Sequence, residues 1–164
     1  MKTFTLLLTL FWIISPLSLR AGEKSVDQEA FGKLTLGQKG EDVLRILGKP
    51  ESRGKEANWE AIGQWVQDWN YPAQGLTLPM ASEKRGGAKT LLNISASAGC
   101  TLTTARGIGI GSSEAAVRKT YGAVEEKSEG KPGETFVAGS LYGGVIFQFK
   151  AGKVTEIFIG AAAE

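Results

Sequence analysis

A short motif occurs twice along this chain at a constant spacing. Leu34-Thr35-Leu36-Gly37, followed by a helical stretch ending at Gly48, returns as Ile108-Gly109-Ile110-Gly111, followed by a stretch ending at Gly122. Both ends of the motif are displaced by 74 positions, from 34 to 108 and from 48 to 122. Because self-similarity at a fixed period indicates a repeated structural unit, the sequence predicts a duplication. A duplication identifies an architecture before it identifies an activity.

Residues 1–21 have the pattern of an export signal. Lys2 gives a positive start, an apolar stretch runs from Phe4 to Ile14, and small residues precede a cleavage position after Ala21. The apolar stretch is too short to span a bilayer, so the pattern predicts a cleaved signal, with an uncleaved anchor as the alternative. We therefore expect a periplasmic or secreted protein whose only membrane contact is this segment.

Charge and length limit the classes of function that remain. Without residues 1–21 the chain has 17 basic and 17 acidic side chains, because Lys2 and Arg20 are removed from the 19 basic ones. A near-neutral chain with interspersed charges lacks the concentrated basic face of a nucleic-acid-binding protein. Each copy has roughly 65 to 75 residues, a size that is marginal for independent folding. We therefore expect the two copies to share a sheet or an interface.

Hydrophobic spacing predicts the same elements in each copy: a short strand, a helix and then strands joined by short turns. Val43, Leu44 and Leu47 give the first helix its apolar face, and Gly48 and Pro50 end it. We expect a loosely held leader at 22–31, a first half at 32–100 and a second half at 101–164. The predicted strands are 34–36, 64–71, 76–78 and 90–96, then 135–141, 145–149 and 153–159. Short turns favour antiparallel pairing, so the predicted class is α+β, two tandem repeats, each a short helix on a three- to four-stranded antiparallel sheet.

The stretch Leu34–Val43, followed by Leu47-Gly48-Lys49-Pro50, resembles the opening of the SmpA/OmlA superfamily of small exported bacterial proteins. That superfamily includes a component of the outer-membrane assembly machinery. The tandem arrangement is similar to that of the beta-lactamase inhibitor proteins, in which two helix-plus-sheet units form one curved sheet. The resemblance implies an extracytoplasmic protein that binds partners through its sheet face or loops. No lipid-attachment cysteine follows the signal, so the resemblance implies no lipid anchor here.

The residue types that are missing exclude much of enzyme chemistry. The chain has no histidine, which excludes Ser-His-Asp and Cys-His arrangements and removes the commonest zinc ligand. Ser52–Lys55 and Ser128–Lys131 match the S-x-x-K pattern of serine-lysine acyl enzymes, but no K-T-G companion accompanies them. We therefore expect no catalytic residue, metal or cofactor. Cys100, the single cysteine, fits a half-buried apolar position, with intermolecular pairing or a reactive thiol as alternatives.

The strongest candidate for a binding site is aromatic. Trp65, Trp69 and Tyr71 alternate along one predicted strand and so share a face, with Trp59 upstream of them. Aromatic side chains in a polar sequence are typical of protein-binding hot spots, and equally of a strand that packs on a helix. Both interpretations stay open at this point.

These features together predict an exported, non-enzymatic protein-interaction module of the bacterial cell envelope. Its partner is expected to be another envelope or secreted protein, with the module acting as an inhibitor or an assembly factor. One alternative is a small secreted hydrolase that uses carboxylates or a Ser-Lys pair. Another is a purely structural envelope protein. The sequence names neither the partner nor the oligomeric state.

Overall fold

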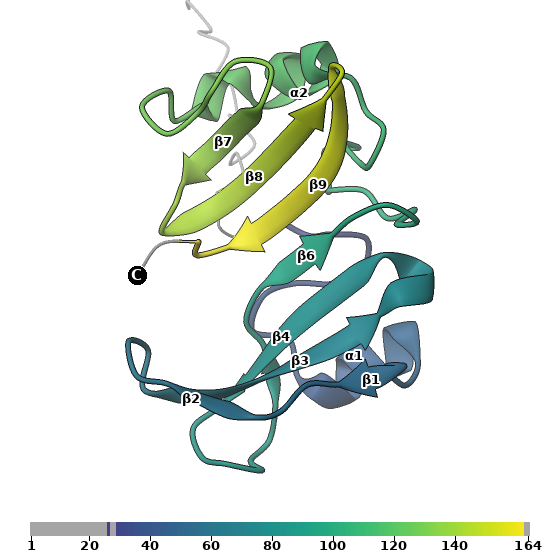
Figure 1. Ribbon diagram of the computed structural model, residues 1–164, viewed down its shortest axis with the longest axis vertical. Coiled ribbons are helices and arrows are strands. Elements are labelled where there is room, and N and C mark those ends of the chain that lie inside the picture. The colour runs from purple at the N-terminus through teal and green to yellow at the C-terminus, as the bar shows by residue number, and fades with distance from the viewer. Residues whose placement is uncertain (1–25, 27–28, 163–164) are drawn as a thin grey trace, which may run out of the picture.

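The computed structural model describes residue 26 and residues 29–162, and the predicted export signal lies outside them. Within this part of the chain, two α-helices and two short 3-10 helices accompany nine strands of one sheet (Figure 1). The helices are α1 (Gly40–Leu47), η2 (Pro72–Gln74), α2 (Glu114–Tyr121) and η3 (Gly122–Val124). The strands are β1 (Ser52–Arg53), β2 (Ala57–Trp59), β3 (Gln64–Tyr71), β4 (Leu76–Ser82), β5 (Thr90–Leu91), β6 (Ile94–Ala96), β7 (Thr135–Ser140), β8 (Gly143–Lys150) and β9 (Lys153–Gly160).

All the strand pairs are antiparallel, and they form a single sheet. Its order is β1-β3-β4-β6-β9-β8-β7, with β2 added to β3 and β5 added to β4. The pairing of Ile94 with Ile159, and of Ala96 with Ile157, joins β6 to β9 and so joins the two halves of the chain. The fold is therefore mixed α and β, with one large antiparallel sheet and few helices.

Each α-helix forms where the sequence predicts one, but the two helices end differently. Glu41 and Asp42 occupy the first turn of α1, where carboxylates interact favourably with the helix dipole. Gly48 ends α1 at a φ of 81°, and its N–H donates to the carbonyl of Leu44. Gly122 instead keeps a right-handed φ of −58° and continues α2 into η3. Gly122 therefore ends α2 where the sequence predicts, but without the left-handed conformation of Gly48.

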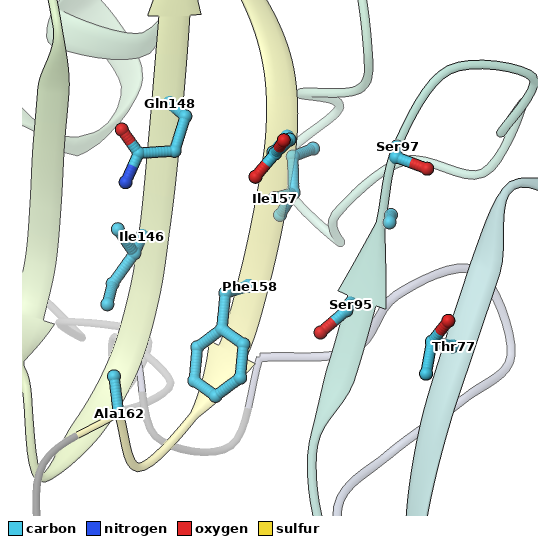
Figure 2. A pocket seen from close by; sticks show the side chains of 10 residues that line it. Thr77, Ser95, Ser97, Ile146, Gln148, Ile157, Phe158 and Ala162 are labelled. Atoms are coloured by element: carbon cyan, nitrogen blue, oxygen red, sulfur yellow. The ribbon is translucent and has the colours of Figure 1, made fainter. Parts of the chain in front are cut away.

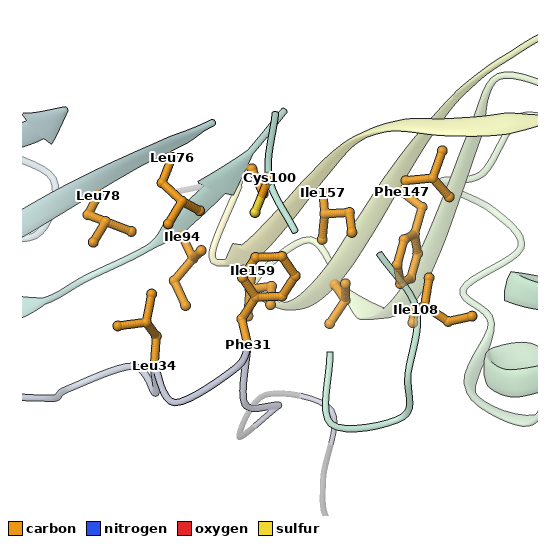
Figure 3. Close-up of a cluster of buried hydrophobic side chains, with 14 of the residues drawn as sticks. Phe31, Leu34, Leu76, Leu78, Ile94, Cys100, Ile108, Phe147, Ile157 and Ile159 are labelled. Carbon is orange, nitrogen blue, oxygen red and sulfur yellow. The ribbon is translucent and has the colours of Figure 1, made fainter. Parts of the chain in front are cut away.

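The hydrophobic core lies between the helices and one face of the sheet. In Figure 1 both helices lie behind the sheet, and Val43 of α1 and Val117 of α2 are fully buried in the same core. A row of paired residues crosses the whole sheet on this covered face, and all its members are buried: Phe136, Phe147, Ile157, Ala96, Leu76 and Tyr71. Figure 3 shows Leu76, Ile157 and Phe147 extending from the same side of the sheet. The core is therefore continuous across both halves.

Two predicted strands differ in the structure. Residues 34–36 form no strand, because Phe31 and Leu34 pair with each other across a tight turn. The strand predicted at 90–96 is divided into β5 and β6, since Leu91 pairs with Met80 of β4 whereas Ile94 pairs with β9. The first difference is caused by a local turn, and the second by pairing with strands that are distant in sequence. The alternation of apolar residues predicts neither.

The end of the predicted leader is packed rather than loosely held. Phe31 is fully buried in the core, and Glu29 has a side chain that is only 2% exposed. The Tyr121 hydroxyl lies 3.0 Å from Glu29 Oε1 and 2.8 Å from the Thr104 hydroxyl, while Arg106 Nε lies 3.3 Å from Glu29 Oε2. Residues 29–31 therefore attach to the second half of the chain. None of the helices in the described residues is long and apolar enough to cross a bilayer.

Candidate functional site

The predicted aromatic site is divided by the structure, and half of it belongs to the core. Trp65, Trp69 and Tyr71 do share one face of β3, as alternation predicts, but that face is the one covered by α1. Trp69 is 4% exposed and Tyr71 is 2% exposed, and the Tyr71 hydroxyl donates to the carbonyl of Gly48 at 3.1 Å. An open aromatic platform over these two residues is therefore wrong, and the core-packing interpretation holds for them.

The other two predicted residues do not join them in one surface. Trp59 pairs directly with Gln64, which places it on the opposite face of the sheet from Trp65 and Trp69. Trp65 is half-buried, and the guanidinium of Arg85 lies 5.6 Å from its ring centre. The four aromatic side chains therefore lie in three different environments.

Trp69 nevertheless forms one wall of a cavity beside the first turn of α1. The cavity has a volume of about 540 Å³, and its apolar lining comes from Trp69, Leu44 and Ala88. Gly40, the first residue of α1, lies against this wall. A larger residue would be crowded here, because its Cβ would lie 3.0 Å from the Trp69 ring and 3.2 Å from Lys89 Cβ. The glycine thus permits the close approach of the helix that forms the cavity.

The charged groups around this cavity differ in how they are engaged. The guanidinium of Arg53 lies 4.5 Å from the centre of the Trp69 ring. Lys89 Nζ instead pairs with Glu56 and donates to the Ser82 hydroxyl at 2.8 Å. Lys89, together with the N–H of Gly86, holds the pKa of the Glu56 carboxyl below its ordinary value. Lys89 is therefore neutralised inside a structural network, whereas no described residue accepts a hydrogen bond from the Arg53 guanidinium.

The face of the sheet away from the helices is called the open face here, and a second row of paired residues crosses it. In order from β7 to β1 this row contains Val137, Ile146, Phe158, Ser95, Thr77, Asn70 and Ser52. Val137 and Ile146 are buried in this row, at 0% and 8% exposed, and its other members are half-buried or exposed. The row is apolar in the second half and polar in the first. Where the two parts meet, the surface is hollowed by about 310 Å³, and Figure 2 shows Phe158, Ser95 and Thr77 at this place.

The polar groups of this hollow are incompletely paired. Gln148 Oε1 accepts from the Thr135 hydroxyl at 2.8 Å, which leaves the amide N–H₂ available. Among the described residues, neither the Ser95 hydroxyl nor the Glu156 carboxylate has a hydrogen-bond or ion-pair partner. Unpaired donors and acceptors beside an aromatic ring are the composition of a ligand- or partner-binding surface.

Two exposed apolar side chains were not identified by sequence reasoning. Ile62 is 39% exposed in the turn between β2 and β3, and Tyr142 is 75% exposed in the two-residue turn between β7 and β8. In Figure 1 both turns lie on the same side of the molecule, at the left. An aromatic residue inside a two-residue hairpin turn cannot reach the core. The exposure of Tyr142 could therefore have been predicted from the Gly143-Gly144 pair that follows it.

The groups considered for catalysis are engaged elsewhere. The Ser52 hydroxyl accepts from the Asn70 side chain at 3.3 Å, and the Ser128 hydroxyl donates to Glu126 at 2.7 Å, so neither S-x-x-K serine is paired with its lysine. Cys100 is buried, and burial raises the pKa of its thiol. Within residues 26 and 29–162, no three acidic or cysteine side chains gather as metal ligands do.

No family model, curated protein or solved structure matches this chain.

Proposed function

We propose that this protein is an exported, non-enzymatic interaction module of the bacterial cell envelope that binds another envelope or secreted protein through its open sheet face. The observation that carries the proposal is the hollow on that face, where Phe158 lies beside polar groups of Ser95 and Glu156 that have no partner among the described residues. Interface centres combine an aromatic or apolar anchor with polar groups that remain to be paired. Tyr142, which is 75% exposed in the turn between β7 and β8, is a second exposed aromatic side chain.

The state of the ionisable groups favours binding over hydrolysis. Ser82 lies 2.8 Å from Lys89 Nζ, but Lys89 also pairs with Glu56, so this serine lies beside an ion pair and not beside a lone lysine. Among the described residues, the hydrolase alternative therefore has no arranged serine-lysine pair to support it.

We also infer that the two halves are tandem copies of one α+β unit. The eight-residue helices begin at residues 40 and 114, a displacement equal to that of the sequence motif. Val43 and Val117 stand at matching positions, and both are 0% exposed in the same core. Antiparallel hairpins follow each helix. This inference is what the suggested kinship with SmpA/OmlA-like and beta-lactamase inhibitor-like proteins requires.

Site-specific photo-crosslinking in the native host tests the proposed interaction. A photo-crosslinking amino acid is placed at Ser95 on the open face or, as a matched control, at the exposed Ala115 on α2 on the opposite side. We expect a discrete protein adduct at position 95 that is absent at position 115. An enzyme in the adduct identifies an inhibitor, and a component of the assembly machinery identifies an assembly factor.

The purified partner then provides a quantitative test. Ser95→Arg is expected to weaken binding by at least about tenfold, because the long side chain fills the hollow that would receive the partner. Ala115→Arg introduces the same side chain on the helical side and is expected to leave the affinity unchanged. Adducts at neither position, or equal adducts at both, contradict the proposal and favour a purely structural protein.

A further inference from the structure

We propose that the cavity between α1 and β3 binds the carboxylate end of an apolar chain, with Trp69 and Leu44 contacting the chain and Arg53 pairing with the carboxylate. This site lies on the helix-covered side of the sheet and does not depend on the partner proposed for the open face. Nothing about an interaction module requires a cavity of about 540 Å³ at this place.

The walls of the cavity suit an apolar group. Trp69 contributes an indole ring, and Leu44 and Ala88 contribute aliphatic surface. The Trp69 indole N–H donates to Gln67 Oε1 at 3.2 Å, and Gln67 in turn donates to the Gly54 carbonyl at 3.1 Å. The polar atom of the ring is thus already satisfied within the protein. The small part of Trp69 that is exposed, 4% of the residue, is therefore apolar ring surface.

The position of Arg53 determines the expected charge of the ligand. Its guanidinium is held 4.5 Å from the Trp69 ring centre, and no carboxylate among the described residues pairs with it. A guanidinium presents five N–H donors in a planar fork that matches a carboxylate. Lys39, also on the rim and exposed, adds a second cation. An anion at this rim thus meets two positive groups that have no described acidic partner.

The remaining charges limit the ligand to a single carboxylate. Glu41 also lies on the rim, so a second negative group there is repelled. The charge of Lys89 is already balanced by Glu56, so Lys89 adds little attraction for a second carboxylate. A monocarboxylate with an apolar chain meets these conditions, and both a fatty acid and the C-terminus of an apolar peptide have that chemistry.

The test compares three probes by NMR titration of the purified protein: octanoate, its neutral isostere octanamide, and an N-acetylated tripeptide with a free C-terminal leucine. We expect saturable shifts of the Gly40 amide and the Trp69 indole N–H with octanoate or the tripeptide. Octanamide is expected to bind about ten- to a hundredfold more weakly, since it cannot form the charge-assisted pair. The tighter of the two carboxylate probes indicates whether the source is a lipid or a peptide.

Variants separate the role of Arg53 from general structure. Arg53→Gln is expected to reduce the affinity for the carboxylate probe to that for octanamide, and Arg53→Lys to give an intermediate value. Arg45→Gln is the matched control, because Arg45 lies on α1 but pairs with Asp42 at 2.6 Å and does not line the cavity. Equal binding of octanoate and octanamide, no saturable shift with any probe, or an unchanged affinity in Arg53→Gln would overturn the proposal.

Discussion

The two halves of the molecule are alike on the helix-covered face of the sheet, where both are packed with buried apolar side chains. They differ on the other face, which is apolar in the second half and polar in the first. On the covered face, Val43 in the first half and Val117 in the second are both fully buried, and the row from Phe136 to Tyr71 is buried throughout. On the open face, the second half has the buried Ile146 and the half-buried Phe158, whereas the first half has the half-buried polar residues Ser95 and Thr77. The comparison indicates that the covered face is packed alike in both halves, while the open face differs between them in polarity.

The second difference between the halves is in how each helix is begun. Ser113 accepts a hydrogen bond from the Ala116 N–H at 3.2 Å, which satisfies a donor that the helix leaves unpaired. Lys39 stands at the same place before α1 and provides no side-chain cap. The first helix depends instead on the Gly40 N–H donating to the Lys89 carbonyl at 2.7 Å. One helix is therefore capped locally, and the other by a loop that is distant in sequence.

The largest expected effect on the free energy of unfolding comes from a substitution in the core of the second half, which tests whether the two halves unfold together. Phe147 is fully buried in the second half, with the rings of Tyr121 and Phe136 5.2 and 6.3 Å away between centres. Phe147→Ala is expected to lower the free energy of unfolding by about 3–5 kcal/mol. Apart from Trp12 in the predicted export signal, every tryptophan lies in the first half. Urea unfolding followed by tryptophan fluorescence therefore reports the half that was not mutated.

Because β6 pairs with β9 and the core is continuous, we expect the fluorescence and far-UV circular dichroism transitions of Phe147→Ala to coincide at a lower midpoint. Leu78→Ala, at a fully buried position of the first half, is the control and is expected to cost about 2–5 kcal/mol. A fluorescence midpoint that stays unchanged while the dichroism midpoint falls shows that the halves fold separately.

A smaller effect distinguishes the two buried tyrosines. Tyr121→Phe is expected to cost about 2–3 kcal/mol, because it removes the hydrogen bond to Oε1 of the buried Glu29 carboxylate and leaves only Arg106 beside that group. Tyr71→Phe removes only a bond to a backbone carbonyl and is expected to cost about 1 kcal/mol. Burial raises the pKa of the Tyr121 hydroxyl, so it stays a neutral donor in this measurement. Urea unfolding of both variants measures the difference, and equal losses would mean that Glu29 is hydrated when Tyr121 is changed.

Changes at the two helix caps are expected to alter the free energy of unfolding by about 1 kcal/mol. They test the difference between α2, which has a side-chain cap, and α1, which has none. Ser113→Ala is expected to lower the stability by about 1 kcal/mol, since the cap on α2 is lost. Lys39→Ser is expected to raise it by about 0.5–1 kcal/mol, because the extended backbone of Lys39 (φ −63°, ψ 143°) suits a capping side chain. Thermal unfolding of the two variants measures both changes. No gain in Lys39→Ser would show that the contact between Gly40 and Lys89 already satisfies this end.

Local sequence signals predicted those elements that depend on local chemistry. The alternation from Gln64 to Tyr71 matches β3, and Ala151-Gly152 forms the predicted turn between β8 and β9. The pairing of β6 with β9 was not predictable, because it brings together strands more than sixty residues apart. The continuity of the sheet depends on that one pairing.

The candidate site was predicted less well for the same reason. Alternation placed Trp65, Trp69 and Tyr71 on one face correctly, but it cannot tell which face a helix will cover. That outcome depends on Gly40, whose missing Cβ lets α1 approach Trp69. Similarly, Arg53 was read only as part of an S-x-x-K match, and its position over the Trp69 ring follows from the pairing of the two residues between β1 and β3.

The smallest expected effect compares one acidic group from each half as the pH falls. A hydrogen bond from Lys89, with help from the Gly86 N–H, holds the pKa of Glu56 below its ordinary value of 4.5, and Arg118 and the Gly133 N–H do the same for Glu114. A carboxyl group with a lowered pKa in the folded state contributes stability above its unfolded pKa. That contribution is lost as the pH falls through the folded pKa.

We therefore expect the contribution of these two groups to the melting temperature to change little between pH 7 and 5. Below pH 4.5 this contribution is expected to fall, and the melting temperature with it. Glu56→Gln and Glu114→Gln are each expected to make that decline shallower, and the double variant to combine both changes because the two groups lie in separate networks. Glu41→Gln on the exposed surface of α1 serves as the control. If either variant keeps the slope of the unmodified protein, its ion pair is not formed in solution. In that case the corresponding half holds its loop, 83–89 or 125–134, by backbone contacts alone.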